Sequence, residues 1–147
     1  MGTWSSAAVL EASPERVLRV LTEPDACARW SPVRFELDQI DSARLATGSR
    51  ARLGGSLIGR RVAFELEILR ADRRSLELRA RGPLEIQARY DARPAGAATF
   101  LRADVSVAPG PGLLGHVAAR AADALLAAGA LDQALHRIAG EVTGSPS

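Results

Sequence analysis

Tyr90, the chain's only tyrosine, is the residue that the sequence places best for chemistry. Apolar and charged residues alternate around it, and Tyr90 falls in step with the apolar Ile86 and Ala88. Successive strand side chains point to opposite faces of a sheet, so this register predicts a phenol on the apolar face. A phenol there could donate a hydrogen bond or a proton to a ligand oxygen without burying a charge. The same register also fits a hydroxyl that merely lies at the rim of that face.

Metal and nucleotide chemistry have weak support. His116 and His136 fall in one predicted helix, about 160° apart around its axis, so they cannot share a metal. Cys27 is the only cysteine, which argues against a disulfide and a cysteine-based metal set. Residues 110–115 match the pattern GxGxxG, but no strand follows to complete a dinucleotide-binding unit. We therefore expect neither a metal nor a cofactor.

Trp30, Arg50 and Arg52 each allow two interpretations, and one ion pair is expected nearby in the sequence. Trp30 either stacks on a ligand at the mouth of a cavity or anchors packing after a short helix. Arg50 and Arg52 lie in a glycine-flanked stretch whose facing is unclear, so they either face solvent or reach an anionic group of a ligand. Asp25 and Arg29 are four residues apart in a predicted helix and are expected to form a surface ion pair.

The elements that position these residues follow from the spacing of apolar side chains. Residues 3–11 are predicted to form a first strand. Ser13 and Pro14 favour the start of a helix, because serine caps helices and proline fits their first turn. A second short helix over about residues 25–30 ends before Pro32. We expect these two helices to form a small V-shaped unit.

From Val33 onward the apolar period changes from 3.6 residues to 2, which predicts half-buried strands. Short turns between them predict an antiparallel meander with one dry face. The positions predicted to face inward are Val33, Phe35 and Leu37, then Val62, Phe64, Leu66 and Ile68, then Leu76, Leu78 and Ala80, then Leu84, Ile86, Ala88 and Tyr90, and finally Thr99, Leu101, Ala103, Val105 and Val107.

A long C-terminal helix is predicted from Leu113 to about Val142. Its small inward side chains would leave space beneath a curved sheet, which predicts a cavity. Alternatively, the sheet flattens onto the helix and the alanines allow close packing. The predicted inward stripe is Val117, Ala121, Ala124, Ala128, Leu131, Leu135 and Ile138.

Composition excludes several classes of protein. The 147 residues, 47% apolar and 24% charged, are typical of one globular domain spanning residues 1–147. All 19 basic residues are arginines, and they alternate with acidic residues to give a net charge of only +2. Nucleic acid is therefore not expected as a partner. No apolar stretch is long enough to span a membrane, and we expect a cytoplasmic protein. The oligomeric state is left open.

Several short motifs, in this order along nearly the whole chain, resemble the START-related, birch-pollen-allergen-like (SRPBCC) superfamily, in particular its polyketide cyclase/dehydrase branch. The motifs are residues 12–17, 21–24, 30–32, 48–50, 59–62, 82–84 and 113–115. The resemblance implies an α+β helix-grip fold. In that fold a curved antiparallel sheet of six or seven strands wraps around a long C-terminal helix, with two short helices after the first strand. It also implies a cavity for a hydrophobic small molecule such as a polyketide or a lipid.

Register and resemblance together predict a ligand cavity between the sheet and the C-terminal helix. Two functions remain open. The first is a cofactor-independent polyketide cyclase, aromatase or dehydratase of bacterial secondary metabolism, with Tyr90 as the catalytic or orienting residue. The second is a non-catalytic carrier or sensor of a lipid or another hydrophobic ligand. The predicted lining is Trp30, Phe35, Phe64, Leu66, Leu78, Ile86, Tyr90, Leu101, Val105, Val117, Ala121, Ala124 and Ala128.

Overall fold

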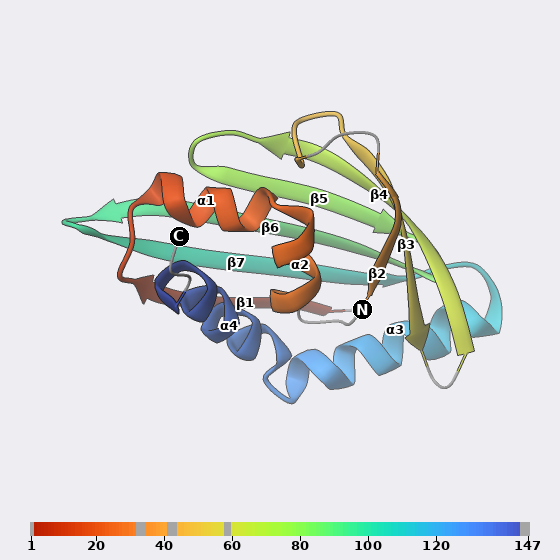
Figure 1. The fold of residues 1–147 in the computed structure, drawn as a ribbon. Coiled ribbons are helices and arrows are strands. Elements are labelled where there is room, and N and C mark those ends of the chain that lie inside the picture. Colours follow the sequence, from red (N-terminus) through yellow and green to blue (C-terminus); the bar gives the residue numbers. More distant parts are fainter. Residues whose placement is uncertain (1, 32–34, 41–43, 58–59, 145–147) are drawn as a thin grey trace.

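A computed structural model describes residues 2–31, 35–40, 44–57 and 60–144, and within these ranges the chain forms one antiparallel sheet and four helices (Figure 1). The predicted α+β class and the order of elements are confirmed. The sheet has seven strands in the order β1-β7-β6-β5-β4-β3-β2. The elements are β1 (Gly2–Leu10), α1 (Pro14–Thr22), α2 (Pro24–Trp30), β2 (Glu36–Ile40), β3 (Arg50–Leu57), β4 (Arg60–Ala71), β5 (Ser75–Arg81), β6 (Leu84–Ala95), β7 (Ala98–Pro109), α3 (Gly112–Ala127) and α4 (Ala130–Gly144).

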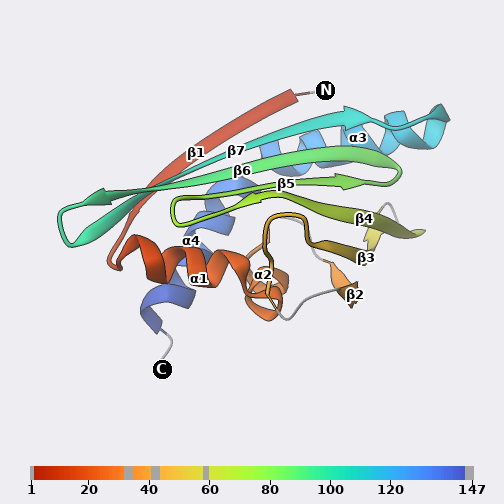
Figure 2. The same ribbon diagram turned by 90° about the horizontal axis from the view of Figure 1, so that it is seen from above.

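The helices form a second layer against one face of the curved sheet. Figure 2 shows α1 and α2 lying together on that side, with α4 next to them. Helix α4 packs on β1 and on both short helices, while α3 packs on β7 and β6. The apolar core fills the space between the layers, and the cavity described below lies within it.

The start of α1 is determined locally. The side chain of Ser13 accepts a hydrogen bond from the backbone N–H of Arg16 at 3.3 Å, and Pro14 occupies the first helical turn. Val17 and Leu21 are fully buried, so the helix turns one apolar stripe toward the core. The predicted cap and stripe are both confirmed, and α2 ends at Trp30, as the following Ser-Pro pair predicts.

The period-2 prediction is confirmed in β4 to β7. Along β7, alternate residues from Thr99 to Val107 are buried, and Arg102 between them is exposed. The hydroxyl of Thr99 donates a 2.6 Å hydrogen bond to the carbonyl of Ala12, which ties the sheet to the connection before α1. Val33 lies outside the described residues, and for Leu37 only the backbone pairing with Leu53 is described.

The predicted long C-terminal helix is broken into two. Helix α3 ends at Ala127, and Gly129 follows with φ of +96°, a backbone conformation that side chains with a Cβ avoid. The two helical axes are bent by 61°. The bend lets α4 run along β1 and the short helices while α3 stays on β6 and β7.

The buried face of α3 also differs from the predicted one. Ala118 and Ala122 are buried, whereas Val117 is 40% exposed. The predicted stripe is therefore wrong in α3, although its continuation through Leu131, Leu135 and Ile138 in α4 is confirmed. Helix α3 is apolar around most of its circumference, so its sequence pattern does not specify one inner face.

Within the described residues, no single helix is both long and apolar enough to cross a membrane. The bent pair made of residues 112–127 and 130–143 passes that test by length and composition.

Candidate functional site

A cavity of about 140 Å³ lies between the sheet and helices α2 and α3. Its wall is almost wholly apolar, and strands β3 to β7 form its floor. Within the described residues no charged side chain lines it. The lining residues are Cys27, Trp30, Ser31, Phe35, Leu45, Leu53, Gly55, Ser56, Val62, Phe64, Leu66, Leu78, Ala80, Leu84, Ile86, Ala88, Tyr90, Val105, Val107, Ala122, Leu125 and Leu126.

The cavity exists because small residues line both layers. Ala80 and Ala88 come from the sheet, and Ala122 comes from α3. None of these side chains is long enough to fill the space that the curvature of the sheet opens between the layers. Two residues of the lining are exposed, Leu125 of α3 at 45% and Ser56 of β3, so the cavity reaches the surface beside them.

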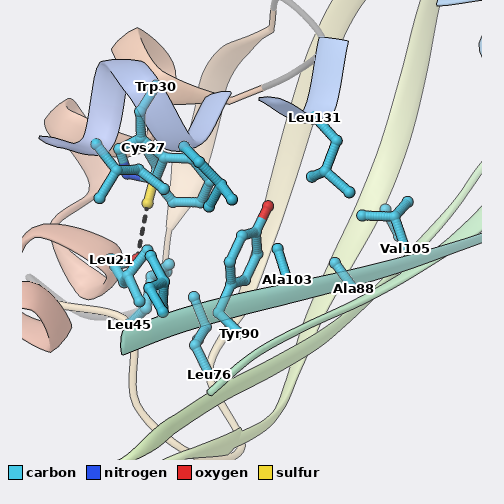
Figure 3. Packing of buried hydrophobic residues seen from close by; sticks show 14 of the residues in the cluster. Leu21, Cys27, Trp30, Leu45, Leu76, Ala88, Tyr90, Ala103, Val105 and Leu131 are labelled. Atoms are coloured by element: carbon cyan, nitrogen blue, oxygen red, sulfur yellow. Dashed lines mark hydrogen bonds between the residues drawn. The ribbon is translucent and has the colours of Figure 1, made fainter. Parts of the chain in front are cut away.

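Two aromatic residues form a buried part of the wall, which we call the buried end. Tyr90 of β6 is 2% exposed and Trp30 of α2 is 3% exposed. Their ring centroids are 5.2 Å apart and the ring planes meet at 77°, an edge-to-face contact. Figure 3 shows the Tyr90 ring rising from the sheet with its hydroxyl directed toward the helices. Trp30 is therefore a packing anchor that also lines the cavity.

Of three polar groups at this end, two are already bonded to the protein. The thiol of Cys27 donates to the carbonyl of Leu21 at 3.0 Å, and the indole N–H of Trp30 donates to the carbonyl of Val20 at 3.4 Å (Figure 3 shows the first contact). Both carbonyls belong to the last turn of α1, and that of Val20 also accepts a 3.4 Å hydrogen bond from the backbone N–H of Glu23. The Tyr90 hydroxyl has no hydrogen-bond partner among the described residues.

Burial keeps both ionisable groups of this end protonated. It raises the pKa of the Cys27 thiol from 9.0 to about 12, with a smaller contribution from the charge of Glu23. Burial likewise raises the pKa of Tyr90 above its ordinary value, with a small contribution from Cys27. Cys27 is therefore a weak nucleophile at neutral pH, and Tyr90 is available there as a neutral donor.

Most of the predicted lining residues come together at this cavity. Those that line it are Trp30, Phe35, Phe64, Leu66, Leu78, Ile86, Tyr90 and Val105. Leu101 is fully buried but lies outside the lining. Val117, Ala124 and Ala128 are exposed and Ala121 is half-buried, because the buried face of α3 differs from the predicted one.

Sequence reasoning missed several residues of the wall. Ala80 and Ala88 were in the inward register, which was a sufficient signal to include them. Ala122 and Leu126 lie on the face of α3 that the pattern did not identify. Cys27 lines the cavity because α2 directs its side chain inward. The spacing of apolar residues around Cys27 did not predict this position.

The charged candidates lie away from the cavity. Arg50 and Arg52 are exposed, and Nη2 of Arg52 lies 3.9 Å from Oε1 of Glu65. The expected Asp25–Arg29 ion pair is replaced by a longer-range one. Arg29 makes two hydrogen bonds, at 2.9 and 3.1 Å, to Glu141 of α4. The tertiary packing of α2 against α4 brings that carboxylate within reach of the guanidinium.

The histidines and the glycine motif do not form sites. His116 and His136 are both exposed, and no cluster of three potential metal ligands occurs in the described residues. A Cβ on Gly115 would lie 2.1 Å from the carbonyl oxygen of Gly110, so glycine is needed for the close turn between β7 and α3.

Comparisons with known proteins agree with this geometry. The model of a family described as polyketide cyclase / dehydrase and lipid transport matches residues 1–143. A protein from Chromobacterium violaceum has the same fold, with a TM-score of 0.69 at 20% identity over 95% of this chain and 96% of its own. For a START superfamily protein from Mycobacterium smegmatis the TM-score is 0.67 at 18% identity over 97% of each chain.

A third structure is DynU16, described as a putative protein in the dynemicin biosynthetic locus. Its TM-score is 0.62 at 25% identity, over 98% of this chain and 48% of DynU16, so this chain spans about half of that protein. No curated protein matches the sequence.

Proposed function

The chain belongs to the polyketide cyclase / dehydrase and lipid transport family of the START-related superfamily, and from this we propose that it binds a hydrophobic small molecule in the cavity between the sheet and α3. The observation that carries the proposal is an apolar cavity built from small residues on both layers. Water finds few hydrogen-bond partners in such a cavity, so an apolar ligand is favoured there over water.

Volume limits what can be enclosed. A dry cavity of about 150 Å³ holds roughly one benzene ring, and this cavity has about 140 Å³. A drug-sized ligand needs at least about 300 Å³. A larger ligand would therefore place one ring or a short chain segment inside and extend through the mouth beside Leu125, or it would displace α3.

The finer proposal is a cyclase or dehydrase of bacterial secondary metabolism acting in the cytoplasm. The name of the family and the place of DynU16 in the dynemicin biosynthetic locus support a biosynthetic role. In this function the cavity holds a folded polyketide-like chain, and the neutral Tyr90 hydroxyl donates a hydrogen bond to a ketone oxygen. That hydrogen bond orients the ketone and stabilises negative charge on its oxygen.

A second candidate is a carrier or sensor of a lipid-like ligand. The specific observation in its favour is the lining itself. Among the described lining residues Cys27 and Tyr90 are the only side chains that titrate, and the thiol is already bonded to Leu21. A carrier needs only the apolar cavity, whereas ring closure with loss of water needs proton transfer in both directions.

Ligand binding is tested by native mass spectrometry of the purified protein, followed by calorimetric titration with isopropylbenzene. We expect a retained apolar ligand or saturable binding of the probe, and we expect Ala122→Leu to abolish binding by filling the cavity. Ala124→Leu, on the exposed face of the same helix, is the matched control and should bind normally. Absence of saturable binding in the wild-type protein, or equal binding by Ala122→Leu, would contradict the proposal.

Tyr90→Phe separates the two candidates once a polyketide-like substrate is in hand. In the cyclase, loss of the hydroxyl lowers turnover by about 10²–10⁴-fold, a larger effect than on affinity. Equal falls in turnover and affinity would make Tyr90 a ligand contact without a catalytic role, and a wild-type protein that binds the substrate without turning it over favours the carrier.

A further inference from the structure

The Tyr90 hydroxyl differs from every other polar group at the buried end of the cavity. The two neighbouring donors, on Cys27 and Trp30, already bond to carbonyls of α1. The hydroxyl of Tyr90 has no hydrogen-bond partner among the described residues, and Tyr90 lines the cavity. The only fully buried side-chain nitrogen or oxygen without a partner in that part of the chain is Nε of Arg79, so the Tyr90 hydroxyl is open to the cavity. Because the wall around it is apolar, a hydrogen bond from this hydroxyl to an acceptor atom of a ligand is stronger than one at a solvated site.

From this arrangement we infer that the ligand carries a neutral carbonyl oxygen on the end that is buried deepest, and that this oxygen accepts a hydrogen bond from Tyr90. The inference rests on the proposed function and specifies its ligand class. A ketone or an ester satisfies it, whereas a pure hydrocarbon leaves the hydroxyl unpaired. Apart from Ser31 and Ser56, the rest of the described wall is apolar, so shape mainly selects the remainder of the ligand.

The same wall disfavours a carboxylate at this end. No charged residue among the described lining residues could compensate a buried anion, and Tyr90 is a single neutral donor. Burying an ionised carboxylate costs far more than burying a ketone. Burial also keeps the phenol protonated, since it raises the Tyr90 pKa, so the donor is present throughout the neutral pH range.

Exposure separates two parts of the lining. Leu125 is 45% exposed and Ser56 is exposed, while Tyr90 and Trp30 are 2% and 3% exposed. A ligand that bonds to Tyr90 must therefore carry its carbonyl on the ring or chain end that is buried deepest.

The test compares probes of nearly equal size. Acetophenone and isopropylbenzene differ chiefly in the carbonyl oxygen, and benzoate adds a negative charge. We expect Tyr90→Phe to weaken acetophenone binding by about 10-fold, the effect of one lost hydrogen bond to a buried donor, and to leave isopropylbenzene within about two-fold. Benzoate should bind the wild-type protein at least about 10-fold more weakly than acetophenone. Ser106→Ala removes an exposed hydroxyl of β7 that does not line the cavity and should change none of these affinities.

The outcomes separate this inference from the proposed function. If the wild-type protein binds neither neutral probe, the proposed function fails. If it binds both and Tyr90→Phe changes the two affinities equally or not at all, the inferred ligand class fails while hydrophobic binding stands. Benzoate binding as tightly as acetophenone would overturn the preference for a neutral oxygen.

A second measurement does not depend on a variant. Because the chain has one tyrosine, ¹³C labelling at the tyrosine ring carbon that bears the hydroxyl gives a single NMR signal. Acetophenone should move this signal in the direction of a stronger hydrogen bond, and isopropylbenzene should not. The same shift with both probes would contradict a carbonyl contact.

Discussion

Enlarging Ala122 tests whether the space beneath α3 is a true cavity. Ala122 is 2% exposed and lines the cavity, so a leucine there would point its extra carbon atoms into empty space. Ala118, on the same helix, is fully buried but does not line the cavity. Ala124 is exposed. The three positions therefore offer the same substitution in three different surroundings.

The expected free energies of unfolding differ in sign. Leucine adds three carbon atoms to alanine, and each buried carbon contributes about 0.8 kcal/mol, so Ala122→Leu gains up to about 2.4 kcal/mol where the space accepts it. Ala118→Leu overpacks a closed site and should lose about 1–3 kcal/mol. Ala124→Leu should change stability by less than about 0.5 kcal/mol. The small difference in helix propensity between alanine and leucine is common to all three and cancels.

Urea unfolding followed by tryptophan fluorescence measures these differences, and Tyr90→Phe serves as a control that leaves the volume almost unchanged. Calorimetric titration with isopropylbenzene measures binding on the same samples. If Ala122→Leu destabilises the protein as much as Ala118→Leu does, the space beneath α3 is closed and the reasoning is refuted.

Three further predictions concern stability. Burial raises the pKa values of Tyr90 and Cys27, so the unfolded chain loses these protons at lower pH than the folded protein does. The free energy of unfolding should therefore be at its full value below about pH 9 and fall above it. Urea unfolding from pH 8 to 12 should show a shallower fall in Tyr90→Phe, and an unchanged fall would contradict a buried phenol. Gly129→Ala should destabilise the protein by about 1–2 kcal/mol because φ is +96° there. Gly140→Ala, inside a helix and with open space around the added Cβ, should stabilise it by about 0.5–1 kcal/mol. Thermal unfolding measures both variants, and a change of melting temperature in the same direction for the two would refute this prediction. Thr99→Val should cost about 1–3 kcal/mol in chemical unfolding because it leaves a buried carbonyl unpaired, and a neutral effect would show that this bond is not needed.

Much of the fold could be predicted because its signals are local. Ser13 and Pro14 mark the start of α1 within a few residues, and alternation along β6 determines which side chains face inward. That alternation placed Tyr90 on the inner face, and its position in the cavity wall follows from one-dimensional spacing.

The face and length of the C-terminal helices required the tertiary structure. Helix α3 is apolar around most of its surface, so neither Ala118 nor Val117 is favoured as the inner residue by its neighbours in sequence. Packing against β6 and β7 decides between them, and Gly129 allows the chain to turn so that α4 can pack elsewhere. A lone glycine in an alanine-rich stretch is compatible with a continuous helix, and only the docking of both halves makes the bend favourable.

The hydrogen bonds at the buried end of the cavity also depend on distant segments. The sequence determined that Tyr90 faces inward, but it did not determine that Cys27 and Trp30 would bond to the carbonyls of α1 and leave the phenol without a partner. Strand register is a property of neighbouring residues, because the pleat fixes it within a few positions. Whether a buried donor finds an acceptor depends on helices that pack against the sheet from elsewhere in the chain, and only the folded structure decides it.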